Sequence, residues 1–211
     1  PLQWDALTMP EVLRANDYVT MLINDTPHMI NLGYGFDRSF HAWEMIRGNE
    51  VDRLRTDWFA DWKLAGKDKF NMASRMALYH RQSMDRALED EYCAPRVMKA
   101  SADWLERNAG HDGFFLCVDS FDPHEPWDPP PWYTEMYDPG YAGKNIVWPT
   151  YGPTDMLSEA EQKHIRANFA GEVTMVDRWL GNMRSVPGFE RAFLLDCPQI
   201  GVRETRHIEG D

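Results

Sequence analysis

Two histidines each follow an apolar run and stand close to a proline. His124 lies in VDSFDPHEPWDPPPWY, residues 118–133, which continues the apolar run FFLCV. His28 ends the segment NDTPH, residues 24–28, after the apolar run YVTMLI. A histidine can donate a proton near neutral pH, and a nearby carboxylate such as that of Asp122 would favour its charged form. The repeated pattern predicts a site for proton transfer, although either loop taken alone also fits a solvated surface turn.

The two apolar runs predict the β-strands that would position these histidines. Residues 18–23 are apolar and partly β-branched, and residues 114–120 are almost continuously apolar. Such runs are typical of a parallel sheet that is covered on both faces. Ligands bind beyond the carboxyl ends of the strands in sheets of this kind. We therefore expect an α/β fold with both histidine loops at one edge of a mostly parallel sheet.

Helices are predicted before, between and after these strands. Thr8 and Glu11 form a capping-box pattern for a short helix that precedes the first strand. Apolar residues recur at helical spacing over 75–108, and Pro95 is expected to divide this region into two helices. Residues 31–60 have mixed glycines, aromatics and charges, which predicts irregular structure.

The longest predicted helix follows the proline-rich loop. Ser158 can cap it, with Glu161 in the box position. Its expected buried stripe consists of five apolar residues at helical spacing: Ile165, Phe169, Val173, Val176 and Leu180.

Composition limits the class of protein. The chain has 211 residues, 43% hydrophobic residues and a formal net charge of −12. These values describe a globular protein and argue against nucleic acid or an anionic membrane as the main partner, since no basic block offsets the charge. Three cysteines without metal-binding spacing predict no disulfide framework. No apolar stretch is long enough to span a membrane.

Three segments resemble the sulfatases, in the branch of the alkaline phosphatase-like superfamily that includes phosphonate monoester hydrolases. They are residues 8–48 with the GFD segment, residues 114–133 with the P-H-x-P loop, and NFAGEVTMVDRWLG at 168–181. They occur in the order found in that family. The resemblance implies a three-layer α/β/α fold with an incomplete central sheet, and a partial sulfatase domain over residues 1–183.

The resemblance also implies roles for individual residues. His124 matches the histidine that contacts the sulfate and helps to protonate the leaving oxygen. His28 matches the histidine that orients the formylglycine hydroxyl, although this chain reads DTPH where the family has K-W-H. We expect Asp25, Asp122 and Trp127 to contact the substrate. That substrate would be a sulfated small molecule or carbohydrate.

Other parts of the family's machinery are not found in this sequence. Sulfatases use a formylglycine nucleophile made from a C/S-x-P-x-R motif, and a divalent metal, usually calcium. The nucleophile and the first two metal-binding aspartates are expected before residue 1. CAPR at 93–96 is one residue shorter than the nucleophile motif and is interpreted as structural, falling between helices. No metal ligand is assigned in this chain, which is therefore expected to be catalytically incomplete alone.

Residues 184–211 do not resemble a sulfatase. GVRETR at 201–206 is similar to the tail of certain FAD-dependent oxidoreductases, which suggests a junction near Met183. A divergent sulfatase strand in RAFLLD remains the other interpretation.

Two further functions stay open at this point. One is a phosphonate or phosphate monoester hydrolase of the same superfamily. The other is a carbohydrate-binding module that presents the aromatic faces of Trp127, Trp132, Tyr133 and Trp148.

Overall fold

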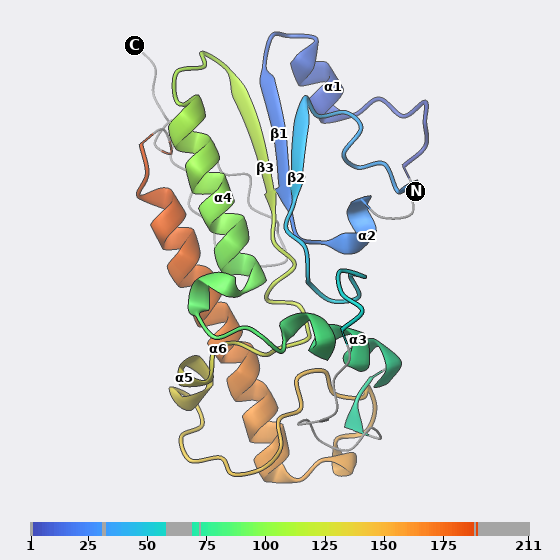
Figure 1. Cartoon of the computed structure of the whole chain (residues 1–211), viewed down its shortest axis with the longest axis vertical. Coiled ribbons are helices and arrows are strands. Elements are labelled where there is room, and N and C mark those ends of the chain that lie inside the picture. The colour runs from blue at the N-terminus through green and yellow to red at the C-terminus, as the bar shows by residue number, and fades with distance from the viewer. Residues whose placement is uncertain (1, 31–32, 58–68, 72, 188, 190–211) are drawn as a thin grey trace.

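A parallel sheet of three strands lies at the centre of the structure, a computed structural model that describes residues 2–30, 33–57, 69–71, 73–187 and 189 (Figure 1). The strands are β1 (Val19–Asn24), β2 (Ala42–Met45) and β3 (Phe114–Asp119), in the spatial order β2-β1-β3. β1 pairs with both neighbours in parallel. The two strands predicted from the apolar runs, and their parallel arrangement, are confirmed.

β2 was not predicted, because it lies within the region expected to be irregular. Its four residues read AWEM, and the first three are exposed to solvent. So short a segment shows neither an apolar run nor a clear alternation. Pairing with β1 defines this strand, with Met21 opposite Ala42 and Asn24 opposite Met45.

Helices α4 (Cys93–Asn108) and α6 (Glu159–Arg184) pack side by side and cover one face of the sheet. The core beneath them contains Met21 and Ile23 from β1, Leu105 from α4 and other apolar side chains. Helices α1 (Met9–Arg14) and α2 (Pro27–Ile30) lie on the other side of the sheet in Figure 1. The predicted α/β class is therefore correct, with a small and open sheet.

Four shorter elements complete the described fold. They are the α-helices α3 (Ala73–Ser83) and α5 (Pro131–Glu135), and the 3₁₀ helices η3 (Glu89–Glu91) and η4 (Thr154–Met156). Among the described helices, none combines the length and the apolar character needed to cross a bilayer.

Local helix signals in the sequence were read correctly at two helix starts. Thr8 and Glu11 form a reciprocal capping box on α1, and Ser158 and Glu161 form one on α6. The prediction for Pro95 was wrong in detail, because the break precedes it and the proline lies in the first turn of α4. Proline is tolerated there, since the first N–H groups of a helix have no intrahelical acceptor. CAPR accordingly begins a helix instead of separating two.

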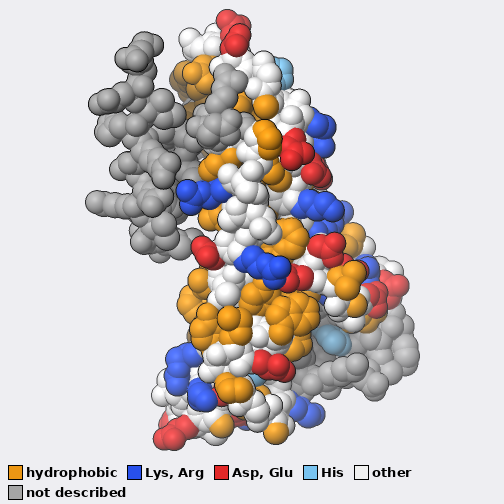
Figure 2. Space-filling view, turned by 90° about the vertical axis from the view of Figure 1, so that its left-hand side faces the viewer, with side chains coloured by type: hydrophobic (Ala, Val, Ile, Leu, Met, Phe, Trp, Pro, Cys, Tyr) orange, Lys and Arg blue, Asp and Glu red, His pale blue; other side chains and the backbone are white. Residues whose placement is uncertain are grey.

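The expected apolar stripe of α6 is only partly buried. Phe169 and Val173 are 44% and 40% exposed, whereas Gly171, Glu172 and Met175 are buried. α5 packs against α6 at Gly171, and this contact selects a different face from the one that hydrophobicity alone indicates. Figure 2 shows hydrophobic side chains gathered on this side of the molecule, over α5 and α6.

Burial differs between the strands. All residues of β1 after Val19 are buried, but every residue of β3 is half-buried. Coverage on both faces, predicted for both apolar runs, therefore holds for the central strand and only in part for β3, at the edge of the described sheet. The predicted change of character over 184–211 falls almost entirely outside the residues that the structure describes.

Candidate functional site

The carboxyl ends of β1 and β3 bring the two histidine loops together. Asn24 and Asp119 are paired at the ends of these strands, so the following residues leave the sheet at the same edge. The ring of Phe121 lies near both imidazoles. Its centroid is 5.8 Å from that of His28 and 4.2 Å from that of His124. Both predicted catalytic residues thus contact one aromatic ring.

One ring nitrogen of His124 is hydrogen-bonded to its own loop, and the other is not. Its side chain is 49% exposed, and Nδ1 lies 2.8 Å from the backbone oxygen of Glu125. Because a carbonyl oxygen only accepts hydrogen bonds, Nδ1 carries the proton in this contact. The side chain of Trp127 donates to the backbone oxygen of Pro123 at 3.0 Å and closes the turn. Nε2 is therefore the nitrogen that remains for proton exchange with a ligand.

His28 lies in the first turn of α2 and is 57% exposed. Its Nδ1 is 3.6 Å from a carboxylate oxygen of Glu50, a buried residue. Arg75 approaches the other oxygen of Glu50 at 4.0 Å. Glu50 was missed in the sequence because nothing in its local pattern points to His28, 22 positions earlier.

Asp25 is buried beneath the histidine loops and does not reach the surface of the site. It is fully buried, and one carboxylate oxygen accepts a hydrogen bond from the backbone N–H of Phe121 at 2.7 Å. The other oxygen accepts one from the side chain of Asn49 at 3.0 Å. Burial, together with the neighbouring charge of Asp122, raises the pKa of Asp25 to about 8. This geometry assigns Asp25 to positioning Phe121, whereas we expected it to contact the substrate.

Asp122 is also directed into the interior. Asn49 approaches its carboxylate at 3.4 Å, and burial raises the pKa of Asp122 while the charge of Arg86 opposes that change. The side-chain carboxylate found near Nδ1 of His124 is that of Glu125, at 3.4 Å. Glu125, and not Asp122, therefore occupies the place that we expected beside the histidine.

Beneath this loop, Arg86 joins several segments of the chain. Its guanidinium donates to the hydroxyl of Tyr79 at 3.1 Å and to the backbone oxygen of Gly48 at 3.2 Å, and it lies 3.7 Å from Asp128. Tyr79 also donates to Asp128. No local sequence pattern indicates this arrangement, because Gly48 and Asp128 are far from Arg86 along the chain.

Glu172 adds a fourth buried or partly buried acid to Asp25, Asp122 and Asp128. Burial, followed by the charge of Asp122, raises the pKa of Glu172 well above its usual value. One of its carboxyl oxygens is buried without a hydrogen-bond partner in the described chain. Asp122, Asp128 and Glu172 share the positive charge of Arg86, so protonation of some of these acids is the favourable state.

Cys93 is a buried thiol. It is 2% exposed, and burial raises its pKa to about 12. A thiol that holds its proton so strongly is a poor nucleophile. The interpretation of CAPR as structural is consistent with this environment.

The acids of the described chain do not fit a metal site. Both oxygens of Asp25 already accept hydrogen bonds from N–H groups, and no group of three His, Cys, Asp or Glu residues among the described positions could hold a metal ion. Within the described positions we therefore assign no ligand to the calcium that the resemblance implies.

The aromatic residues considered for sugar stacking differ in exposure. Tyr133 and Trp148 are 4% and 2% exposed, so neither can present a free face. Trp132 is 46% exposed, and the half-buried Trp127 makes an edge contact with Phe169 at 5.6 Å. The carbohydrate-binding interpretation thus loses two of its four aromatic faces.

Comparisons with solved structures address the fold. The phosphonate monoester hydrolase of Agrobacterium radiobacter aligns with a TM-score of 0.51 and 12% identity, over 87% of this chain and 44% of that one. The chain has an alkaline phosphatase-like fold. It spans less than half the length of that hydrolase.

A second solved structure is that of Ps i-CgsB in complex with k-i-k-neocarrahexaose. It aligns with a TM-score of 0.41 and 15% identity, over 83% of this chain and 35% of that one. No protein-family model and no curated protein matches the sequence.

Proposed function

We propose that this chain is part of a hydrolase of the sulfatase and phosphonate monoester hydrolase branch, acting on sulfate esters. The observation that carries the proposal is the placement of His28 and His124 against one ring, that of Phe121. The alkaline phosphatase-like fold supports it, since ligands of open parallel sheets bind at this edge. The formylglycine nucleophile and the divalent metal of such an enzyme would be supplied from outside this chain.

His124 would act on the leaving group. With Nδ1–H held by Glu125, an imidazolium can transfer its Nε2 proton to the ester oxygen as the bond to sulfur breaks. His28, whose side chain is 57% exposed, would bind the anionic group. Asp25 would hold the backbone of Phe121, the residue that both imidazoles contact.

Binding of inorganic sulfate tests the site in this chain. We expect sulfate to shift the NMR signals of both imidazole rings, and His124→Ala to weaken sulfate binding seen at His28. His111→Ala is a matched control, because His111 lies in the turn before β3, at the opposite end of that strand. Sulfate that shifts neither His28 nor His124 would contradict the proposal.

Activity provides the second test. An aryl sulfate should not be turned over by this chain alone, and a longer protein that includes the nucleophile should hydrolyse it. In that protein His124→Ala should lower kcat by about 10²-fold or more, as expected for loss of a general acid. Unchanged turnover in the His124 variant would exclude the proposed role.

A phosphonate monoester is the second candidate substrate. It is favoured by the hydrolase of Agrobacterium radiobacter, which shares the fold, and by DTPH at the position where sulfatases have K-W-H. Parallel assays with an aryl sulfate and an aryl phosphonate monoester, in the longer protein, separate the two by their kcat/KM values.

A further inference from the structure

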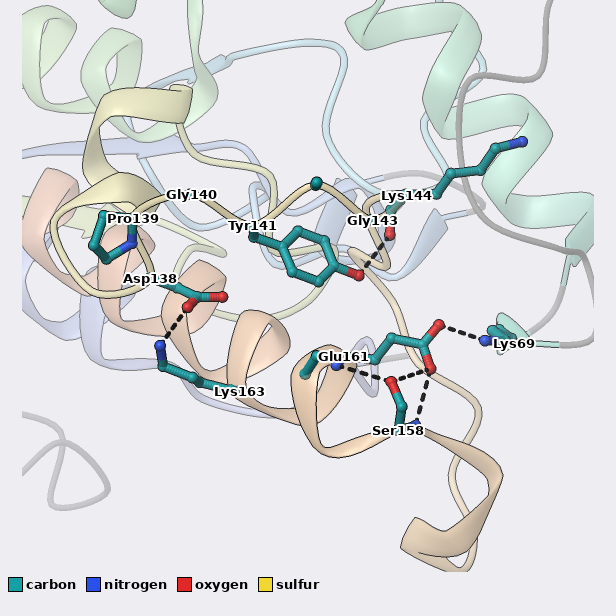
Figure 3. Close-up of a pocket in the computed structure, with 12 residues that line it drawn as sticks. Lys69, Asp138, Pro139, Gly140, Tyr141, Gly143, Lys144, Ser158, Glu161 and Lys163 are labelled. Atoms are coloured by element: carbon teal, nitrogen blue, oxygen red, sulfur yellow. Dashed lines mark hydrogen bonds and ion pairs between the residues drawn. The ribbon is translucent and has the colours of Figure 1, made fainter.

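A hollow lies away from His28 and His124, where residues 138–144 face the first turns of α6 (Figure 3). Its cavity has a volume of about 690 Å³, and three lysines line it: Lys69, Lys144 and Lys163. Two acids also line it, and Lys69 pairs with Glu161 and Lys163 with Asp138, so Lys144 gives this hollow its positive balance in a chain of net charge −12. Such a local excess of cations favours an anionic ligand.

The loop that forms this hollow is rigidly built around Tyr141. Its ring stacks on the ring of His164 with centroids 3.8 Å apart, and its hydroxyl donates to the backbone oxygen of Lys144 at 3.2 Å. A Cβ atom at Gly143 would lie 2.3 Å from that hydroxyl oxygen, so the ring position requires glycine there. Figure 3 shows Tyr141 lying over the hollow, between the loop and α6. One aromatic face is therefore fixed where a ligand can stack.

An adjoining hollow extends the surface past Lys69. Its volume is about 400 Å³, and its lining includes Lys69, Arg166 and Tyr151, which is 67% exposed. Lys144 and Arg166 are exposed and have no ion-pair partner in the part of the chain that the structure describes. The two hollows share Lys69 and together form a groove, which we call the Tyr141 groove. It contains two tyrosines and four cations, of which Lys69 and Lys163 are paired with acids and Lys144 and Arg166 face a ligand.

We propose that the Tyr141 groove binds an oligosaccharide that carries sulfate groups, separately from the histidine site. Sugar rings present C–H faces that pack on tyrosine, and sulfate groups pair with lysine and arginine. A nucleic acid fits less well, because it requires a continuous row of phosphate contacts and is repelled by the acidic remainder of the chain. The proposal does not depend on the hydrolase function, since none of its residues belongs to the histidine loops.

Calorimetric titration of the chain with a dextran sulfate oligosaccharide, and with unsulfated dextran of equal length, tests the groove. We expect the sulfated probe to bind at least about tenfold more tightly. Lys144→Ala and Arg166→Ala should each weaken that binding about two- to fivefold, the range for one exposed ion pair. Lys99→Ala, an exposed lysine on α4, should leave binding unchanged.

The stacking part of the proposal has its own variants. Tyr141→Ala and Gly143→Ala should weaken binding of the sulfated probe by about threefold or more, while Tyr141→Phe should retain it. Thermal unfolding of each variant checks that the fold persists. The losses caused by Lys144→Ala and Tyr141→Ala should persist in the His124→Ala background, which distinguishes this groove from the histidine site.

Four outcomes would overturn the proposal. They are equal binding of both dextrans, unchanged binding in the Lys144 and Arg166 variants, groove-variant losses that disappear in the His124→Ala background, and tighter binding of a single-stranded oligonucleotide than of dextran sulfate. Failure of the hydrolase assays would leave these binding results unaffected, so the two proposals fail independently.

Discussion

At the residue scale, the buried carboxyl of Asp25 connects the sheet to the histidine loop. It accepts hydrogen bonds from the backbone of Phe121 and from the side chain of Asn49. Phe121 in turn contacts the rings of both His28 and His124. A buried residue therefore holds the backbone of the aromatic residue that both candidate catalytic groups contact.

The raised pKa of Asp25 predicts a dependence of stability on pH. In the folded chain this carboxyl keeps its proton up to about pH 8, whereas the unfolded chain loses it near the usual value of 3.8. The folded state therefore binds the extra proton between these values, and its stability falls as the pH rises through this window. We expect the free energy of unfolding in urea to be lower at pH 8 than at pH 5 by about 1–3 kcal/mol.

Substitution of Asp25 tests whether its carboxyl causes this dependence of stability on pH. Asp25→Asn should reduce the difference between pH 5 and pH 8, with a remaining slope from Asp122, Asp128 and Glu172, whose pKa values are also raised. Asp112→Asn, at an exposed position, is the control. A difference of the same size in Asp25→Asn and in the unchanged chain would contradict this explanation.

At the scale of elements, α6 shows how packing selects a helix face. A Cβ atom at Gly171 would lie 3.1 Å from Pro129 and from the backbone of Tyr133 and Thr134, so α5 approaches α6 closely only because glycine is present. Gly181, on the same helix, has open space around it. The two glycines therefore serve different purposes within one helix.

These glycines predict opposite effects of the same substitution. Gly171→Ala should lower the free energy of unfolding by about 1–2 kcal/mol, because the cost of overpacking exceeds the gain in helix propensity. Gly181→Ala should raise it by about 0.5–1 kcal/mol, the propensity gain alone. Chemical denaturation of both variants measures the two values, and a stabilised Gly171→Ala would show that α5 does not pack closely there.

At the scale of the whole molecule, Arg86 joins regions that are distant in sequence. Its side chain contacts the backbone after β2 through Gly48, the start of α4 through Cys93, and the proline-rich loop through Asp128. The same guanidinium offsets part of the charge of the buried acids. The ion pair and hydrogen bonds of Arg86 therefore hold the proline-rich loop against the rest of the fold.

Removal of the Arg86 charge should lower the free energy of unfolding. Arg86→Met leaves the acids without their cation, and loss of one partner of a buried pair typically costs about 3–5 kcal/mol. The loss should be smaller at pH 5 than at pH 7, because Asp128, with a pKa of about 6, becomes protonated at the lower pH. Urea unfolding at both values tests this, and Arg53→Met, at an exposed position, should change stability by less than about 0.5 kcal/mol. Equal losses at the two pH values would contradict the electrostatic explanation.

The sequence by itself determined features that depend on neighbours along the chain. The strands at 18–23 and 114–120 follow from continuous apolar runs, and the starts of α1 and α6 follow from capping boxes closed within three residues. The prediction that His28 and His124 lie close together also used the principle that parallel strands have their carboxyl ends at one edge of the sheet.

Only the tertiary structure decided which distant residues meet. β2 forms by pairing with β1, and packing against α5 selects the buried face of α6. Glu50 reaches His28 across 22 positions, and Arg86 reaches Asp128 across 42. Asp25 and Asp122 were placed at the right edge but turned inward, because buried N–H donors and a guanidinium attract their carboxyl groups. Sequence patterns record local hydrogen bonding and hydrophobic period, whereas the direction of a polar side chain depends on partners that folding brings from elsewhere.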